Sequence, residues 1–328
     1  SIKKGSSWIL KFKLSGRILM IKPKLIEVVY GGFSGEREVS LKSGVVIAES
    51  LEKAGYCVEL TDIQSPVWNP KPGVEFVFIG LHGAYGEDGK IQSKMDDLGI
   101  SYSGSSSRSS QLAFNKHLSK EVFIKSGLST PNGVTVSGIE QTRQTNFSTP
   151  LVVKPVSDGS SLGLEFVDHA EQLESAVQNC MRVTDQVLIE ERIYGRELTV
   201  GILGDETLPI IEIRPQEGGY NYKNKYTAGG AEHICPAELT GKEQNKVIEL
   251  AMAAFRSLGC SHYGRVDIML DRDSNPFVLE VNTLPGMTEF SLLPEAAQEV
   301  GITLPELCSQ IVELSWKESS EKLNASDG

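Results

Sequence analysis

Residues 264–282 carry a pattern of polar and apolar side chains that strongly limits how this part of the chain can fold. Two runs, 264–270 and 277–282, are rich in Val, Ile, Leu and Phe, as β-strands are. Between them the sequence is typical of a turn, centred near Asp273 and Ser274. The segment therefore predicts an antiparallel hairpin.

The position of this turn predicts which side chains face one another. Asp267 should lie opposite Glu280, and Arg265 opposite Asn282, with all four on one face because strand side chains alternate. The other face should pack on a core through Val266, Ile268, Leu279 and Val281. Two carboxylates about 5 Å apart repel each other unless a cation lies between them. Oxygen ligands of this kind suit Mg²⁺ or Mn²⁺, and the alternative is a solvated strand face.

Length and composition fit a globular protein with two or three domains. The chain has 328 residues, of which 40% are hydrophobic and 23% charged. The net charge of −11 argues against a nucleic-acid partner, which needs a basic surface. No apolar run approaches the length of a membrane span. The five cysteines are scattered without a C-x-x-C pair, which favours a reduced, cytoplasmic compartment over a disulfide framework or a zinc site.

The two ends of the sequence differ from the rest. Residues 1–19 are basic and lack acidic side chains, so they form either a transit peptide or an extension before a natural start at Met20. Residues 316–328 are polar, and we expect this tail to be frayed.

Residues 20–104 predict an α/β domain. A strand at 25–30 leads through a glycine-rich turn into a helix from about Glu36 to Ala54, which is the entry to a doubly wound unit. The turn is not G-x-G-x-x-G, so a dinucleotide site is poorly supported. Strands near 57–60 and 76–81 follow, and the latter enters the polar turn of residues 82–89. Ligands bind at the carboxyl ends of such strands, so Glu36 and His82 should share one crevice.

A second domain is expected at residues 105–190, after a serine-rich connector. It contains a helix near 116–126, a polar loop at 138–150 and a strand at 151–155. The glycine- and serine-rich loop that follows this strand has the character of a phosphate-binding loop, and equally that of a hairpin turn. Lys154 at the end of a buried strand favours the phosphate interpretation, because a buried ammonium needs an anion.

Together these motifs resemble the ATP-grasp enzymes, and more narrowly the D-alanine:D-alanine ligases of bacterial cell-wall synthesis. Six blocks in family order carry the resemblance: residues 31–41, 81–89, 153–163, 222–226, 264–267 and 280–288. It implies an α/β and α+β fold, with an N-terminal doubly wound (Rossmann-like) domain and a two-lobed ATP-grasp fold at 105–190 and 191–315.

The resemblance also implies an activity in which ATP phosphorylates the carboxylate of one D-alanine and the amine of a second D-alanine attacks the acyl phosphate. Residues implied to bind ATP are Lys116, Lys154, Ser160, Ser161, Glu190, Glu191, Ile193, Glu197 and Lys225. Those implied to hold two Mg²⁺ or Mn²⁺ ions are Asp267, Glu280 and Asn282. Those implied to bind D-alanine are Glu36, His82, Ser291 and Leu292.

Catalytic roles are implied for Glu36, Ser160, Tyr226, Arg265 and the backbone N–H of Gly286. Arg265 would stabilise the oxyanion of the tetrahedral intermediate, although an arginine between carboxylates can also be their salt-bridge partner. His82 can be a substrate contact or a histidine that caps its own loop. Glu197 can accept ribose hydroxyls or be an exposed side chain.

Residues 218–232 are too long and too rich in glycine for a rigid connector, so we expect a mobile lid over bound nucleotide. Family membership further implies a cytoplasmic homodimer that supplies peptidoglycan precursors. Three alternatives stay open. They are a ligase that joins D-alanine to D-lactate, another ATP-grasp ligase, and a regulatory module that has lost its chemistry. Tyr226 counts against the first, and the complete set of polar site residues counts against the last.

Overall fold

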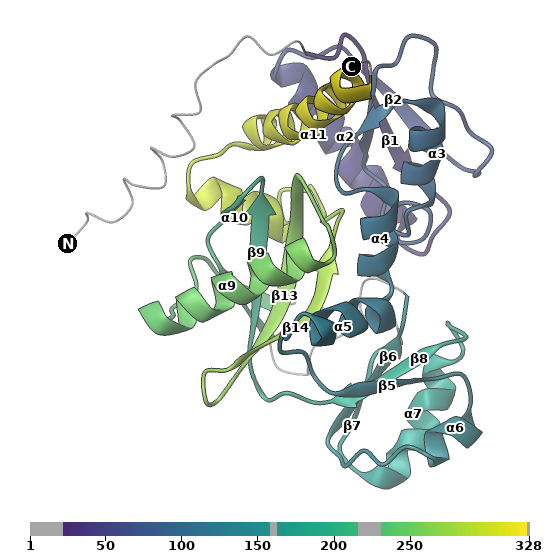
Figure 1. Ribbon diagram of the computed structural model, residues 1–328, viewed down its shortest axis with the longest axis vertical. Helices are drawn as coiled ribbons and strands as arrows, with labels where there is room; N and C mark the ends of the chain where they lie inside the picture. The colour runs from purple at the N-terminus through teal and green to yellow at the C-terminus, as the bar shows by residue number, and fades with distance from the viewer. Residues whose placement is uncertain (1–21, 158–162, 216–230, 327–328) are drawn as a thin grey trace.

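The computed structural model describes residues 22–157, 163–215 and 231–326. Three sheets with their helices follow one another along the long axis of the molecule (Figure 1). The N-terminal sheet lies at one end, the sheet that contains β13 and β14 in the middle, and the small sheet of β5 to β8 at the other end.

The N-terminal sheet is parallel, with strand order β2-β1-β3-β4. Its strands are β1 (Ile26–Gly31), β2 (Val58–Ile63), β3 (Phe76–Ile79) and β4 (Ser101–Tyr102). Its helices are α2 (Arg37–Lys53) and α3 (Lys90–Leu98). The apolar runs of β1 and β3 are buried, as expected of a parallel sheet covered on both faces. The doubly wound domain predicted from the sequence is confirmed.

The small sheet is antiparallel, in the order β5-β8-β6-β7. Its strands are β5 (Gly133–Val136), β6 (Leu151–Pro155), β7 (Glu165–Val167) and β8 (Val187–Glu191). The helices on it are α6 (Ile139–Arg143), the 3-10 turn η1 (Ala170–Gln172) and α7 (Leu173–Cys180). The expectation of a loop throughout 138–150 was wrong, because α6 forms there, and the buried Thr142 helps to anchor it.

The middle sheet has the order β12-β11-β9-β13-β14, and β10 also pairs with β9. Its strands are β9 (Gly195–Leu203), β10 (Glu206–Thr207), β11 (Ile211–Pro215), β12 (Ala231–Ile234), β13 (Tyr263–Asp271) and β14 (Pro276–Asn282). Helices α9 (Gly241–Ser257), α10 (Leu292–Glu299) and α11 (Leu304–Ser326) complete the C-terminal part.

Two helices connect the N-terminal domain to the small sheet, α4 (Ser107–Phe114) and α5 (Lys116–Lys125). Ala113 of α4 and Phe123 of α5 are buried in the same cluster as the β9, β13 and α9 core. The boundary expected near residue 105 stays a prediction, and the two helices after the serine-rich connector pack on the middle sheet. The small sheet has a buried cluster of its own.

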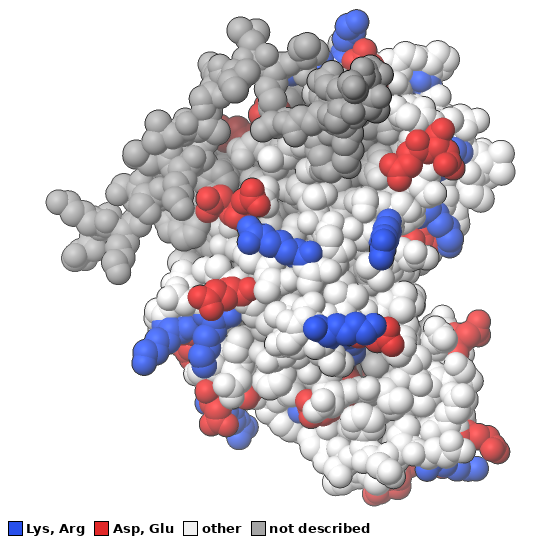
Figure 2. Space-filling view, viewed as in Figure 1, with Lys and Arg blue, Asp and Glu red and all other residues white. Residues whose placement is uncertain are grey.

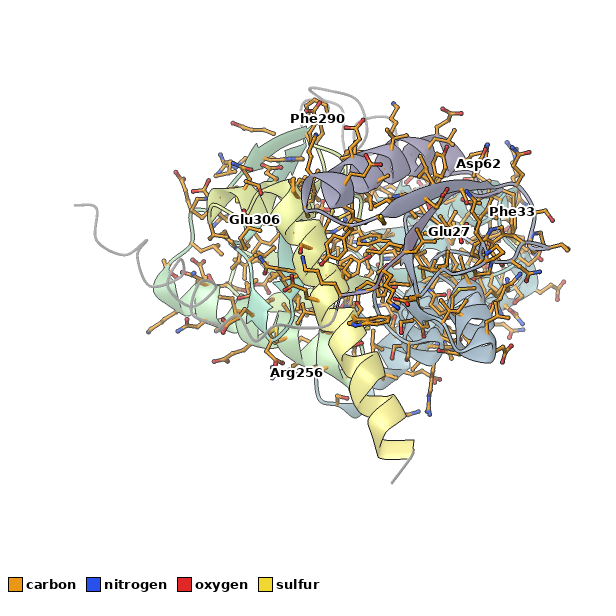
Figure 3. All side chains as sticks on the ribbon, turned by 90° about the horizontal axis from the view of Figure 1, so that it is seen from above. Glu27, Phe33, Asp62, Arg256, Phe290 and Glu306 are labelled. Carbon is orange, nitrogen blue, oxygen red and sulfur yellow. The ribbon has the colours of Figure 1, made fainter. Side chains whose placement is uncertain are left out.

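The C-terminal helix returns to the N-terminal domain, where α11 packs against α2. Seen from above in Figure 3, α11 crosses the molecule next to the N-terminal domain. Its apolar residues, among them Leu307 and Ile311, belong to the same buried cluster as β1 and β3. Its bounds extend to Ser326, into the tail that the sequence analysis expects to be frayed.

Charged side chains of both signs are interspersed on the face of the molecule shown in Figure 2. Within the described residues, no patch of one sign dominates that face. None of the helices in the described ranges combines the length and apolar character that a membrane crossing requires.

An ion cluster around the buried Glu212 on the middle sheet makes the stability of the protein depend on pH. Glu212 of β11 accepts hydrogen bonds from Arg196 Nε at 2.9 Å and from Arg214 at 3.0 Å. Hydrogen bonds from Arg196 lower the pKa of Glu212 most, and a hydrogen bond from Arg214 lowers it further. Burial raises this pKa, but the net result is a decrease from the ordinary 4.5 to about 2. Because the folded-state pKa is depressed, this stabilisation is present above pH 4.5 and lost as the pH falls toward 2. We expect the free energy of unfolding of Glu212→Gln to depend less on pH over that window than that of the parent protein. At pH 7 the variant should be less stable by ~2 kcal/mol. Urea titrations at several pH values measure both effects.

Candidate functional site

The hairpin of β13 and β14 has the register that the sequence predicts. Asp267 pairs with Glu280, and Arg265 pairs with Asn282. Strand β9 lies on the other side of β13 and adds Thr199 opposite Asp267. Because paired residues project to the same face, two neighbouring rungs of the sheet bring these polar groups together.

A β-bulge corrects one detail of this prediction. The register shifts between Asp267 and Ile268, so Ile268 pairs with Val278 and Leu279 is the extra residue. Val278 is therefore buried in the core cluster, whereas Leu279 is partly exposed. The bulge directly precedes Glu280, at the end of the apolar residues 277–279 of the strand.

Asp267 is held by neutral and charged donors. Its carboxylate accepts Nε of Arg265 at 2.9 Å and a second guanidinium nitrogen at 2.8 Å, and it also accepts the Thr199 hydroxyl at 2.6 Å. Asp267 and Arg265 are both buried. A buried charge needs such partners, so this pair is stable as it stands. Sequence reasoning missed Thr199, because its role depends on which strand lies beside β13.

Glu280 is reached by a lysine from another element. Lys116, the first residue of α5, places Nζ 3.2 Å from a Glu280 carboxylate oxygen. The backbone N–H of Lys116 donates to Val156 O at 2.9 Å, which fixes the start of α5 beside the end of β6. Lys116 thus connects the small sheet to the metal-ligand candidates of the hairpin.

The hairpin face has the donor chemistry that Mg²⁺ requires, namely two carboxylates on one rung and an amide oxygen on the next. Within the described residues, no cluster of three or more His, Cys, Asp or Glu side chains suitable for a metal is present. A divalent ion here would rely on Asn282, ATP phosphates and water in addition to Asp267 and Glu280. Asn282 Oδ1 accepts the N–H of Leu284 at 2.9 Å, which orients the amide.

Helix α10 closes over the same face of the sheet. Gly201 pairs with Arg265, and a Cβ on Gly201 would lie 2.8 Å from the side chain of Leu293 in α10. At the start of this helix, Ser291 Oγ accepts the N–H of Thr288 at 3.0 Å. A Cβ on Gly286 would lie 2.7 Å from Ser291 Oγ, so Gly286 and Ser291 are in close contact.

Leu292 begins α10 and is partly buried. The neighbouring Phe290 is 75% exposed and projects from the edge of the molecule (Figure 3). The predicted second-substrate residues therefore lie at the N-terminus of a helix that covers the Arg265 side of the sheet.

The two glycine-rich turns of the N-terminal domain are adjacent. Ser34 Oγ donates to His82 O at 2.7 Å and accepts the Glu36 N–H at 3.2 Å. Glu36 is buried at the start of α2, and its carboxylate lies so close to Gly83 that a Cβ there would be 2.7 Å from Oε2. Gly83 also has a positive φ of 70°. The backbone of the second turn thus forms the wall beside the Glu36 carboxylate.

His82 is held by its own domain. Its Nε2 is 3.1 Å from Ser43 Oγ, and its Nδ1 is 3.6 Å from a carboxylate oxygen of Glu87. Glu87 also accepts the N–H of Gly83 at 3.1 Å. These contacts are typical of a histidine that stabilises its own loop. His82 also directly precedes Gly83, whose backbone lies next to the Glu36 carboxylate.

The predicted nucleotide residues of the small sheet converge on a buried carboxylate. Glu190 of β8 forms ion pairs with Lys154 of β6 and with Lys120 of α5, the latter at 2.9 Å. All three side chains are buried. Burial opposes ionisation of Glu190, but the two lysines, Lys154 first, hold its pKa below the ordinary value. Sequence reasoning missed Lys120, although its four-residue spacing from Lys116 on one helix was a usable signal.

The remaining nucleotide candidates continue from β8 into β9. Glu191 accepts the N–H of Asn132 at 2.9 Å, and Ile193 is partly buried in the connection. Glu197 pairs with Met269 and lies on the Thr199 face by strand alternation. It is partly buried, and its predicted contact with ribose hydroxyls stays a prediction.

Several predicted residues lie outside the described ranges. These are Ser160, Ser161, Lys225, Tyr226 and the predicted lid 218–232 except for its last two residues. Ala231 and Glu232 begin β12. The roles predicted for the others stay predictions.

Comparison with known proteins agrees with this arrangement. The family model described as D-ala D-ala ligase C-terminus matches residues 128–313. A D-alanine–D-alanine ligase of Methylacidiphilum infernorum is 42% identical over 294 residues, which cover 90% of this chain and 96% of the relative.

Solved structures are similar as well. That of D-alanine–D-alanine ligase from Bacillus anthracis complexed with ATP has a TM-score of 0.80 and 32% identity, covering 91% of this chain and 99% of the other. The VanG D-Ala:D-Ser ligase from Enterococcus faecalis has a TM-score of 0.79 and 26% identity, covering 90% of this chain and 100% of the other. The fold, the polar face of the hairpin and these matches agree, and the chain belongs to the D-alanine–D-alanine ligase family.

Proposed function

We infer that this chain is an ATP-dependent ligase that joins two D-alanine molecules into D-alanyl-D-alanine, a precursor of peptidoglycan. The observation that carries the inference is the hairpin face, where Asp267, Glu280 and Asn282 lie beside a buried arginine. Lysines from α5 and β6 approach from the neighbouring sheet. This is the charge pattern that transfer of a phosphoryl group to a carboxylate requires.

The first step joins two anions. A carboxylate oxygen of the first D-alanine attacks the γ-phosphorus, the bond to the β-γ bridging oxygen breaks, and ADP leaves. Lys116 and Lys154 are the described cations placed to offset the negative charge of the phosphates. Asp267, Glu280 and Asn282 would hold Mg²⁺, which neutralises charge on the transferred phosphoryl group when bound.

Two side chains at the proposed metal site have protein partners. Asp267 accepts hydrogen bonds from Arg265, and Glu280 forms an ion pair with Lys116. When bound, a divalent ion would neutralise the two carboxylates, and the proposed roles of the cations are that Arg265 donates to the oxyanion and Lys116 binds a nucleotide phosphate.

The second step forms the peptide bond. The amine of the second D-alanine attacks the carbonyl carbon of the acyl phosphate, and a tetrahedral intermediate collapses with loss of phosphate and a proton. Arg265 and the N–H of Gly286 are the donors proposed for its oxyanion. Ser291, at the N-terminus of α10, is the side chain proposed to bind the second carboxylate, and a helix N-terminus favours an anion there.

The experiment that tests this function measures phosphate release from ATP and Mg²⁺ with D-alanine, and identifies the product by mass. Parallel reactions add D-lactate or D-serine, because the VanG relative is titled a D-Ala:D-Ser ligase. Dipeptide formed in step with phosphate supports the proposal. If the main product joins D-alanine to D-lactate or to D-serine, the second substrate is that compound. If ATP binds but no D-amino acid causes phosphate release, the protein is not a D-amino-acid ligase.

We also propose that the enzyme acts in the cytoplasm, where ATP and the precursors of peptidoglycan are available, and that it forms a homodimer. Sedimentation of the full chain at several concentrations tests the second proposal.

Substitution of Gly83 tests the pocket assigned to the first D-alanine. A Cβ there would press on Glu36 and on Ser34 Oγ, at 2.7 and 3.0 Å. We expect Gly83→Ala to raise the KM for D-alanine by about tenfold, with ATP affinity unchanged. Gly73→Ala is the matched control, because Gly73 has a similarly positive φ of 85° but nothing within 4 Å of a Cβ. If both substitutions raise the KM for D-alanine equally, the cause is backbone strain and not contact with Glu36.

A further inference from the structure

Helix α5 lies between the two sheets and presents two buried lysines one helical turn apart. Lys116 contacts Glu280 on β14 of the middle sheet. Lys120 contacts Glu190 on β8 of the small sheet. Residues four apart lie on the same side of a helix, so one face of α5 supplies a cation to a carboxylate of each sheet.

The ammonium of Lys120 lies among three acceptors of the protein. Its Nζ donates to Thr130 Oγ1 at 2.9 Å and to Pro131 O at 2.6 Å, and it forms an ion pair with a Glu190 oxygen at 2.9 Å. Two of its three N–H donors are therefore hydrogen-bonded to the protein. Burial lowers the pKa of Lys120, and the carboxylate of Glu190 opposes that shift. Lys120 is thus held by two hydrogen bonds and one ion pair.

Lys154 differs from Lys120 in this respect. Among the described residues, Glu190 is the side chain that forms an ion pair with Lys154. Lys154 is buried, so its ammonium needs acceptors, and a ligand that enters the site can supply them. If Glu190 had Lys154 as its sole cation, the pair would be neutral. With Lys120 present, the group of three carries one net positive charge.

Lys120 is also connected to the hairpin. Thr130, which accepts from Lys120, donates its own hydroxyl hydrogen to Val278 O at 2.9 Å. The neighbouring Ser129 O accepts the N–H of Val278 at 2.9 Å. Val278 is the residue at the bulge, two positions before Glu280. The contact chain therefore runs from Glu190 through Lys120 and Thr130 to the strand that carries the metal-ligand candidate.

We propose that Lys120 is a positioning residue. It neutralises buried Glu190, so that the charge of Lys154 is available to a nucleotide phosphate. Through Thr130 it also fixes the position of Glu190 and Lys154 relative to β14. The proposal rests on the proposed function in that ATP is the ligand of Lys154. It assigns Lys120 no contact with ATP. Its effect on phosphate binding passes through Glu190 and Lys154.

The test compares ATP with adenosine by calorimetry and by competition, on the full chain without D-alanine. We expect Lys120→Met to weaken ATP by at least about tenfold, which corresponds to ~1.4 kcal/mol, and adenosine by less than about threefold. Lys120→Gln keeps a hydrogen-bond donor without the charge, and should weaken ATP to the same degree. Lys125→Met is the matched control, since Lys125 is on the same helix but 77% exposed, and should leave both affinities unchanged.

A double-mutant cycle shows whether Lys120 acts through Glu190. In a Glu190→Gln background, loss of Lys120 should weaken ATP by less than about threefold, because no carboxylate is left to neutralise Lys154. Additive losses, or equal losses for ATP and adenosine, would overturn the proposal and identify Lys120 as a purely structural side chain. An unchanged ATP affinity in Lys120→Gln would overturn it too, since this variant removes the charge and keeps N–H donors at the position.

These measurements separate the inference from the proposed function. Affinities are determined without D-alanine, so a chain that binds ATP but forms no dipeptide would contradict the ligase activity and leave the role of Lys120 standing. Thermal unfolding of each variant without nucleotide confirms that the affinities belong to folded protein.

Discussion

Arg265→Ala should lower turnover by at least ~10²-fold while ATP affinity stays within about threefold of the parent enzyme. The guanidinium is buried on the face where Asp267, Glu280 and Asn282 project. Loss of an oxyanion donor acts on the transition state and not on the bound nucleotide, so kcat should fall much more than ATP binding. Steady-state kinetics with saturating D-alanine, together with calorimetry of ATP binding, measures the two quantities.

The structure also indicates which result would contradict the oxyanion role. Arg265 donates twice to Asp267, so its removal takes two donors from that carboxylate, to which the Thr199 hydroxyl also donates. If Arg265 served mainly to neutralise Asp267, Arg265→Ala would strengthen or weaken metal and ATP binding in parallel with rate. Equal losses of ATP affinity and turnover would therefore refute the oxyanion role. Arg256→Ala is the control, because Arg256 is an exposed side chain of α9 in the same part of the chain (Figure 3).

The hairpin was predictable because local sequence determines it. Its turn residues fix which strand positions pair, and alternation then assigns each side chain to a face. Arg265 and Asn282, and Asp267 and Glu280, consequently pair as expected. The parallel N-terminal sheet was predictable for a similar reason, since buried apolar strands ended in glycine-rich turns at the α/β spacing.

The failures of prediction concern contacts that local sequence does not determine. The bulge at Leu279 was missed because the apolar run from Phe277 to Leu279 is compatible with either register. Lys120 was missed because a lysine in a helix is usually solvated, and its burial depends on packing between two sheets. The position of α10 over Gly201 is likewise a tertiary contact between segments far apart in sequence.

Family resemblance implies roles that local physics does not, namely those predicted for Glu36, Ser291 and Gly286. The structure shows how the segments that carry these residues are connected. The loop after β14 is packed into the N-terminal core through Leu284 and Met287. The hairpin and the turns around Glu36 are thereby fixed to one buried cluster.

Glu280→Gln should lower turnover by at least ~10²-fold and weaken Mn²⁺ binding by at least about tenfold, measured by electron paramagnetic resonance without nucleotide. Glutamine keeps the size of the side chain and removes the charge that attracts a divalent ion. Asp273→Asn is the matched control, since Asp273 is exposed in the turn of the same hairpin. It should leave turnover and Mn²⁺ affinity unchanged.

Substitution of Lys116 distinguishes a metal-binding role of Glu280 from a purely structural ion pair, because the two roles predict different changes in Mn²⁺ affinity. Its ammonium lies 3.2 Å from Glu280, where it competes with a metal ion for the carboxylate. If Glu280 is a metal ligand, Lys116→Met should tighten Mn²⁺ binding without nucleotide, whereas Glu280→Gln weakens it. If Glu280 only anchors Lys116, both substitutions should leave Mn²⁺ affinity unchanged and destabilise the chain to thermal unfolding. Opposite shifts in Mn²⁺ affinity therefore assign Glu280 to the metal, and parallel losses of stability assign it to the junction between α5 and β14.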